Sequence, residues 1–246
     1  MQCKVCGQNN SPKARFCSKC GNALGAAAQQ LSEIGVGSSY SNGRRQLWKH
    51  FLVLFLIVII TALIYAPSFI MREIAEEMGG DAGAVLFIFS MAYTILLMSP
   101  IGYGVSFVFL KAARDDPLDV KDMFEAFKNY WNAVLAGLLV GIIVVIGVIL
   151  LIVPGIIFAC RLAFTSYLVV DRKMQAIEAI KESWRMTNGH AWKVFLIGLL
   201  SIPVYIAGLI FFGVGIIIAI MWVSLTFASL YHAVSRFTLS CGQQLR

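Results

Sequence analysis

Four cysteines near the N-terminus carry the clearest chemistry in this sequence. Cys3, Cys6, Cys17 and Cys20 form two C-x2-C pairs with ten residues between them. Four thiolates at this spacing complete the tetrahedral shell of Zn2+ and leave no open position for water, so we predict a structural zinc site. Two disulfides or a redox C-x-x-C are the alternatives. A reducing cytosol disfavours the first, and the lack of a surrounding βαβ pattern disfavours the second.

The cysteines define a small N-terminal unit, residues 1–24. The unit is too short to bury a core, so the metal is expected to supply most of its folding free energy, on the order of 10 kcal/mol. It resembles the short zinc-ribbon domain found at the N-terminus of many prokaryotic membrane proteins. Residues 25–46 are rich in Ala, Gln, Ser and Gly, a composition that predicts a flexible linker.

Apart from Lys49, Lys193 and Arg236, which lie at the cytoplasmic ends of their segments, Arg161 is the one charged residue inside a predicted membrane-spanning segment. An ionisable group at that depth is a candidate functional residue, here for contact with an anion or a lipid headgroup. Two structural alternatives stay open. The long side chain can extend toward the outer surface, or it can donate to backbone carbonyls freed near Pro154 or Pro203.

The remaining candidate residues are charges at the ends of predicted helices. Asp171 ends the fourth span and is expected to pair with the neighbouring Arg172 and Lys173 or with the helix that follows. In that helix, Glu178 and Lys181 are spaced to form an ion pair. No paired carboxylates occur within a span, and none of the hydrolase, protease or nucleotide-binding motifs is present, so we predict no enzymatic activity.

The surroundings of these residues must be lipid. Of the 246 residues, 59% are hydrophobic and 13% are charged, whereas soluble domains carry about 25% charged residues. A crossing needs about 20 apolar residues. We predict six spans in an all-α domain over residues 47–240; they cover 48–66, 84–110, 131–153, 156–170, 192–212 and 216–237. The third and fourth are separated only by Pro154 and Gly155, which predicts a hairpin.

The charge distribution predicts the orientation. The net charge is +7, and nearly all basic residues fall on one side when the N-terminus is placed inside, whereas the long outer loop holds Arg72 among four carboxylates. This asymmetry is typical of a multi-pass protein of the plasma (inner) membrane with both termini cytoplasmic. It also accounts for the basic charge without a nucleic-acid partner, because such residues face an anionic leaflet.

Internal repetition suggests three related hairpins side by side. Spans one, three and five begin alike at Trp48, Trp131 and Trp192, as expected for an interfacial aromatic belt. Two connecting segments, 124–131 and 177–184, are also alike, and apolar residues at helical spacing, from Val120 to Tyr130 and from Ile177 to Trp184, predict amphipathic helices at the cytoplasmic surface. Asp119 is the expected N-cap of the first of these.

The run Pro154-Gly155-Ile156-Ile157, then Arg161, Asp171 and the segment Glu178-Ala179-Ile180-Lys181-Glu182-Ser183-Trp184 carry a further resemblance. Residues 44–237 resemble an uncharacterised prokaryotic integral-membrane family related to the membrane portion of certain glycerophosphodiester phosphodiesterases. The catalytic barrel of those enzymes needs about 250 residues of its own. The resemblance therefore implies the membrane fold without the activity.

Two functions are compatible with these features. The first is a non-enzymatic membrane adaptor or regulatory protein, in which the zinc ribbon binds a protein partner. The second is a transporter or lipid-handling protein with a polar path near Arg161, because repeated hairpins often surround such a path. Membrane lipids are expected partners in both cases, and a homo-oligomer is compatible with either.

Overall fold

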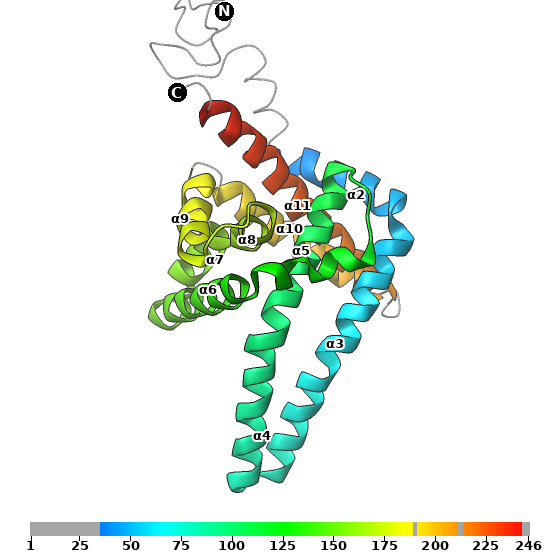
Figure 1. Ribbon diagram of the computed structural model, residues 1–246. Helices are drawn as coiled ribbons and strands as arrows, with labels where there is room; N and C mark the ends of the chain where they lie inside the picture. Colours follow the sequence, from blue (N-terminus) through cyan, green and yellow to red (C-terminus); the bar gives the residue numbers. More distant parts are fainter. Residues whose placement is uncertain (1–34, 189–190, 211–213, 243–246) are drawn as a thin grey trace, which may run out of the picture.

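The chain is helical throughout the part that its computed structural model describes, which is residues 35–188, 191–210 and 214–242 (Figure 1). The cysteine ribbon and residues 25–34 of the predicted linker lie outside these ranges. The α-helices are α2 (Val36–Lys49), α3 (Phe51–Met78), α4 (Gly80–Tyr93), α5 (Ser99–Arg114), α6 (Tyr130–Leu150), α7 (Ile152–Leu162), α8 (Thr165–Asp171), α9 (Ala176–Thr187), α10 (Ala191–Ile210) and α11 (Val214–Gly242). A π-helix, η1 (Thr94–Met98), joins α4 to α5, and a 3-10 helix, η2 (Val120–Asn129), precedes α6.

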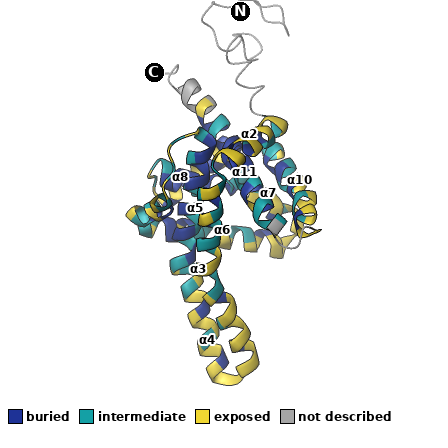
Figure 2. Cartoon of the chain, turned by 90° about the vertical axis from the view of Figure 1, so that its right-hand side faces the viewer, coloured by how far each residue is buried: buried dark blue, intermediate teal, exposed yellow. Residues whose placement is uncertain are grey.

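Six helical segments are long and apolar enough to cross a membrane, the number predicted. They are Phe51–Met78, Gly80–Arg114, Val120–Leu150, Ile152–Asp171, Ala191–Ile210 and Gly215–Arg236. Only 17% of the most apolar stretch of the first segment is buried within the protein. Its large apolar side chains therefore face outward (Figure 2), which suits lipid as the surrounding solvent.

The α3–α4 hairpin projects well beyond the other helices in both views (Figures 1 and 2). Its turn is Gly79–Gly80, where both residues have positive φ angles, +58° and +56°, a conformation that glycine adopts at little cost. The segment after residue 66, which was expected to be a long outer loop, is instead helical. Because α3 continues past Pro67 to Met78, Glu73, Glu76 and Glu77 lie on a helix about 42 Å long, which exceeds the roughly 30 Å hydrocarbon layer. The fourth carboxylate, Asp81, lies in the first turn of α4.

The other helices form a body around α5 and α11. α11 packs against α2, α5 and α10, and its buried residues include Met221, Leu225 and Tyr231. α6 packs against α7 but runs across the direction of α4 and α5 in Figure 1. The expectation of three hairpins side by side is therefore not met in this body, although consecutive spans do pack in pairs.

The break between α6 and α7 lies at Leu151, which is extended, with φ −167° and ψ 145°. Pro154 instead occupies the first turn of α7, where its missing N–H leaves no helical bond unmade. The two helices approach closely because both are glycine at the contact. A Cβ on Gly147 would lie 3.0 Å from the Cα of Gly155.

The first predicted amphipathic segment is η2, and the Asp119 N-cap is confirmed. The carboxylate of Asp119 accepts from the backbone N–H of Lys121 at 3.0 Å. The predicted α-helical face is wrong, because a 3-10 helix has about three residues per turn. Met123 and Ala126 are buried on one side, and the backbone at Met123 passes so close to Gly104 of α5 that no side chain would fit there.

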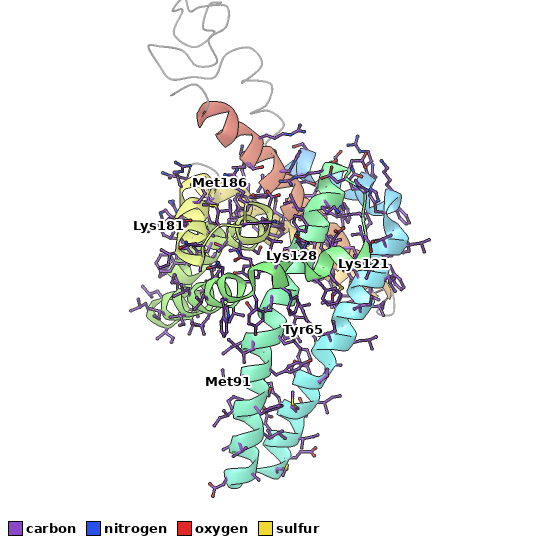
Figure 3. All side chains as sticks on the ribbon, viewed as in Figure 1. Tyr65, Met91, Lys121, Lys128, Lys181 and Met186 are labelled. Carbon is purple, nitrogen blue, oxygen red and sulfur yellow. The ribbon has the colours of Figure 1, made fainter. Side chains whose placement is uncertain are left out.

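The second amphipathic segment, α9, is an α-helix with two different apolar faces. Ala179, Ser183 and Met186 pack into the body, whereas Ile177 and Trp184 remain exposed. The exposed pair belongs to the face predicted to meet the lipid interface. Met186 and the outward-pointing Lys181 are marked in Figure 3.

The predicted flexible linker is wrong for its last part, because residues 36–46 belong to α2. This helix contains two glycines, three serines and an asparagine, which are poor helix formers. Contacts with the body hold it: Trp222 of α11 donates to the carbonyl of Tyr40 at 3.0 Å, and the Tyr40 hydroxyl donates to the carbonyl of Ile197 at 3.1 Å. Composition predicted a coil, and tertiary packing overrides it.

Candidate functional site: a partly buried ion pair beside a polar cavity

Arg114 and Asp171 form a bidentate ion pair where α5 and α8 end. Nη1 and Nη2 of Arg114 donate to the two carboxylate oxygens of Asp171 at 2.6 and 2.7 Å. The Tyr231 hydroxyl donates to Asp171 Oδ2 at 3.1 Å, and Arg114 Nε donates to Nδ1 of His232 at 3.2 Å. Each charge therefore has a partner, as buried charges require.

This ion cluster, Arg114, Asp171, Tyr231 and His232, joins three helices that are distant in sequence. The Arg114 and Asp171 side chains are 24% and 13% exposed, so water screens their attraction only in part. The Tyr231 ring is fully buried and stacks on Tyr167 with centroids 4.9 Å apart. The prediction that Asp171 pairs locally is wrong, because its partner lies 57 residues earlier in the chain.

A polar cavity of about 380 Å3 opens beside the ion cluster. α2, the C-terminal end of α5 and α11 line it. The lining residues are Ser38, Ser39, Asn42, Arg45, Gln46, Ala113, Arg114, Asp115, Ser229, His232, Ala233 and Arg236. Figure 1 shows that α2 lies at the end of the molecule opposite the tip of the α3–α4 hairpin.

α2 supplies one wall of the polar cavity through a ladder of side chains. Asn42 Nδ2 donates to the carbonyl of Ala113 at 3.3 Å and to Ser229 Oγ at 2.9 Å. Arg45 in turn donates to Asn42 Oδ1 at 3.0 Å. Gln46 is 3% exposed, and its Oε1 is buried without a hydrogen-bond partner. An orphaned acceptor in an otherwise paired wall needs an explanation.

Asp115 closes the same end of the molecule. It follows α5 in the left-handed conformation with φ 67°, and Lys49 Nζ donates to both of its carboxylate oxygens at 2.6 Å. His50 Nε2 lies 3.3 Å from Oδ1. Hydrogen bonds from Lys49 and then His50 lower the pKa of the Asp115 carboxyl, because they stabilise its charged form.

Arg161 lies at the end of α7, since the fourth span is divided into α7 and α8. Its guanidinium stacks over the Trp184 ring of α9 at 4.8 Å, a cation–π contact. Its carbonyl accepts from the hydroxyls of Ser183 and Thr187 at 2.9 and 3.1 Å. α9 therefore completes the hydrogen bonding at the end of α7, and neither predicted structural alternative describes Arg161.

The other predicted ion pairs are only partly present. Arg172 reaches Glu182 of α9 at 3.7 Å, and Arg185 joins the same carboxylate at 2.9 Å. The predicted pair of Glu178 with Lys181 is wrong, since neither residue belongs to an ion pair among the described residues; both are exposed. Glu182, whose side chain is 13% exposed, is the carboxylate of α9 that lies between these two arginines.

A second cavity, of about 820 Å3, is mostly apolar and lies where η1 meets α3, α5 and α6. Tyr65 and Met91 line it from facing helices and are labelled in Figure 3. The π-helix ends next to Pro100, whose missing N–H disturbs the α-helical pattern. Insertions of this kind are frequent at functional positions.

The predicted zinc ligands Cys3, Cys6, Cys17 and Cys20 lie outside the described residues. Within the described ranges, no group of histidine, cysteine and carboxylate side chains is arranged to hold a metal ion. Cys160 is a free, half-buried thiol in α7.

Sequence reasoning did not single out Arg114, Tyr231, His232 or Gln46 as a site. One signal was available for Arg114. Arg114 ends the second span and Asp171 ends the fourth, and the predicted topology places both ends on the same side, where opposite charges attract. Nothing in the sequence indicates that Gln46 is buried, because α2 has the composition of a linker.

The fold and this site define a class: over its described residues the protein is all-helical, with six helices there that are long and apolar enough to cross a membrane. Residues 140–237 match the model of a family described as "Protein of unknown function (DUF975)". The match includes Arg161, Asp171 and the Tyr231–His232 pair, whereas Arg114 and α2 lie outside it. No curated protein and no solved structure matches the chain.

Proposed function

We propose that this chain is a non-enzymatic adaptor or regulatory protein of the plasma membrane, in which the six-span body is the anchor and the N-terminal ribbon binds a protein partner. The observation that carries the proposal is the attachment of α2. Gly43 packs against Thr226, and a Cβ at Gly43 would lie 2.9 Å from Thr226 Oγ1. A ribbon that precedes a docked helix starts from a fixed place on the body, which favours defined presentation to a partner.

The proposal includes the expected topology and metal. With both termini cytoplasmic, α2, the ion cluster and the polar cavity face the inner leaflet, and the acidic tip of the α3–α4 hairpin faces outward. Zn2+ held by the four thiolates would fold the ribbon. The relation to the membrane portion of the glycerophosphodiester phosphodiesterases belongs to the same proposal and implies no catalysis.

Crosslinking in native membranes tests the adaptor function. The intact chain and a form that lacks residues 1–24 are purified in mild detergent, and the crosslinked proteins are compared. We expect the partner to be lost from the truncated form and from a Cys3→Ser, Cys6→Ser variant, but kept by Cys160→Ser, which removes a thiol outside the ribbon. Recovery of the same partners with and without residues 1–24 would contradict the adaptor function.

A lipid-handling protein is the second candidate, and the apolar cavity beside η1 is the observation that favours it. Its size is in the range of small-molecule sites, and its lining would accept an acyl chain. Arg161 provides the discriminating variant. If lipid is moved along a path near this residue, Arg161→Ala should abolish lipid exchange in reconstituted vesicles. The adaptor function predicts no change in partner recovery for the same variant.

A further inference from the structure

We propose that the apolar cavity beside η1 binds one acyl chain of an uncharged ester lipid, and that the oxygens of the ester accept hydrogen bonds from Tyr103 and Ser166. This inference rests on the second candidate function in its choice of cavity, and it adds the class of lipid and the groups that hold it. It requires binding but no movement of lipid, so the two are tested separately.

Two hydroxyl groups of the cavity lining have no hydrogen-bond partner among the described residues. They belong to Tyr103 of α5 and Ser166 of α8, two helices that pack against each other. Neither oxygen is sealed within the protein, whereas the hydroxyl of the neighbouring Thr165 is buried and also unpaired. A ligand in the cavity therefore reaches both donors. Because lipid offers them no water, an acceptor on the ligand would stabilise the bound state.

The other four hydroxyls of the described lining are already engaged. Those of Thr94, Ser99 and Ser106 donate to backbone carbonyls at 2.9, 3.2 and 2.9 Å. The Tyr65 hydroxyl donates to the carbonyl of Met98 at 3.5 Å. Two donors of this lining are therefore left for a ligand.

No charged side chain belongs to the described lining of the cavity. A carboxylate or phosphate placed there would lose its hydration and gain no counter-charge, which costs more than two hydroxyl hydrogen bonds return. An ester is a neutral acceptor and loses much less on leaving water. The lining therefore favours an uncharged lipid over a fatty acid or a charged headgroup.

The two free donors lie toward one end of the cavity. Tyr103 and Ser166 precede Arg114 and Asp171 by eleven and five positions, so they lie on the side of the ion cluster. Met91 lines the cavity from the projecting hairpin (Figure 3). It precedes Tyr103 by twelve positions in one helical segment, which corresponds to about 18 Å. One acyl chain spans a similar length, roughly 15 Å, or half of the hydrocarbon layer.

The apolar lining is open to the surroundings. Met91 and Ile142 are 50% and 47% exposed although both line the cavity. Gly141 of α6 also lines it, and a Cβ added there would meet nothing within 4 Å. An acyl chain therefore enters from the surrounding lipid without any separation of the helices.

Photocrosslinking of the purified full chain in detergent tests the proposal. The probe is methyl palmitate with a diazirine near the end of its chain, and mass spectrometry identifies the labelled peptides. We expect the label on α4 or α6, near Met91, because the ester end is held at Tyr103. Unlabelled methyl palmitate should displace the probe. Fully ionised palmitate has the same chain and should compete at least tenfold less well, since its charge finds no partner.

Two double variants test the hydroxyl groups. Tyr103→Phe with Ser166→Ala removes only the two free donors, and it should weaken the binding of methyl palmitate about tenfold, the effect of two hydrogen bonds. Tyr93→Phe with Ser106→Ala removes two hydroxyls that already donate to backbone carbonyls, at 3.0 and 2.9 Å. This control should bind as the native chain does.

Two glycine variants test the cavity itself. Gly141→Phe places a ring in the cavity without a clash, so crosslinking should decrease at least tenfold. Gly198→Phe is the matched control in α10, because a Cβ there also meets nothing within 4 Å and Gly198 does not line the cavity. Equal crosslinking of these two variants would overturn the cavity as the binding site.

The remaining outcomes are equally distinct. Equal binding by the two double hydroxyl variants would overturn the assignment of Tyr103 and Ser166 to the ester. Stronger competition by palmitate than by methyl palmitate would overturn the uncharged class of lipid. Binding at the cavity without lipid exchange in vesicles would contradict the lipid-handling function, and it would support the site.

Discussion

At the scale of single residues, the ion cluster is the feature on which the body depends most. Arg114 and Asp171 each end a helix, and the bonds to Tyr231 and His232 attach both ends to α11. Removing one member leaves the other charge without its partner in a site that water reaches only in part. For the same reason the cluster contains one positive and one negative charge, which compensate each other.

Asp171→Asn should lower the free energy of unfolding by about 3 kcal/mol, because it leaves the Arg114 charge unpaired. Replacing both residues, by Arg114→Met with Asp171→Leu, should cost less than the single change. Thermal unfolding in detergent measures both effects. Glu178→Gln is the control, since this carboxylate is exposed and belongs to no ion pair, and an equal loss in this control would contradict the role of the cluster.

Asp115 predicts a pH dependence at acid pH. Its pKa in the folded protein is lowered by Lys49 and His50, so its stabilising contribution is complete above the unfolded value of about 3.9 and is lost as the pH falls through the folded pKa. The protection of α2 from an acid-active protease should therefore decrease only below about pH 4. Asp115→Asn should abolish that dependence; a loss of protection between pH 5 and 7 would contradict it.

At the scale of elements, the packing of α2 on α11 is a contact that the amino-acid composition of α2 does not predict. Gly43 faces Thr226, and a Cβ there would lie 3.2 Å from the Thr226 backbone nitrogen. Gly37, in the same helix, has nothing within 4 Å of an added Cβ. One helix therefore contains a glycine that the contact requires and another that it does not.

Gly43→Ala should weaken the docking of α2 by about 1–3 kcal/mol through overpacking, whereas Gly37→Ala should leave it unchanged or strengthen it by up to about 1 kcal/mol, because alanine favours the helix. The rate of tryptic cleavage at Arg44 and Arg45 measures docking. Equal rates in the two variants would show that α2 does not depend on the contact with Thr226.

At the scale of the whole molecule, three exposed tryptophans belong to α2, α6 and α10, whereas a group of acidic residues belongs to the α3–α4 hairpin. Trp48, Trp131 and Trp192 are each about two-thirds exposed, at 65%, 69% and 68%. Trp48 and Trp192 stack on Phe51 and Phe195, whereas Trp131 meets Tyr130 edge-on. The internal repeat stays a prediction. The acidic residues of α3 lie at the opposite end, on the projecting hairpin (Figure 2).

The proposed orientation is tested by cysteine labelling in intact cells. In a background that lacks the native cysteines, Glu77→Cys near the hairpin tip should react with a membrane-impermeant maleimide. Lys121→Cys in η2 should react only after permeabilisation, because the basic connections stay on the cytoplasmic side. Both positions are exposed, and labelling of Lys121→Cys in intact cells would overturn the topology.

Sequence alone determined the features that depend on composition and local periodicity. The number of apolar segments, the turn between α6 and α7 near Pro154 and the cap at Asp119 follow from segment length, from proline and from one carboxylate, and all three are present in the fold. The ribbon cysteines remain a prediction, because they lie outside the described residues.

Only the tertiary structure decided which residues meet. Asp171 bonds to Arg114 and not to Arg172, Arg161 stacks on Trp184, and α2 is a docked helix where composition predicts a linker. In each case the deciding energy comes from a partner far away in the chain, which periodicity and propensity do not record. Gln46 shows the reason most simply: it is buried in a helix that packs on α11, and the polar cavity forms where α2, α5 and α11 meet.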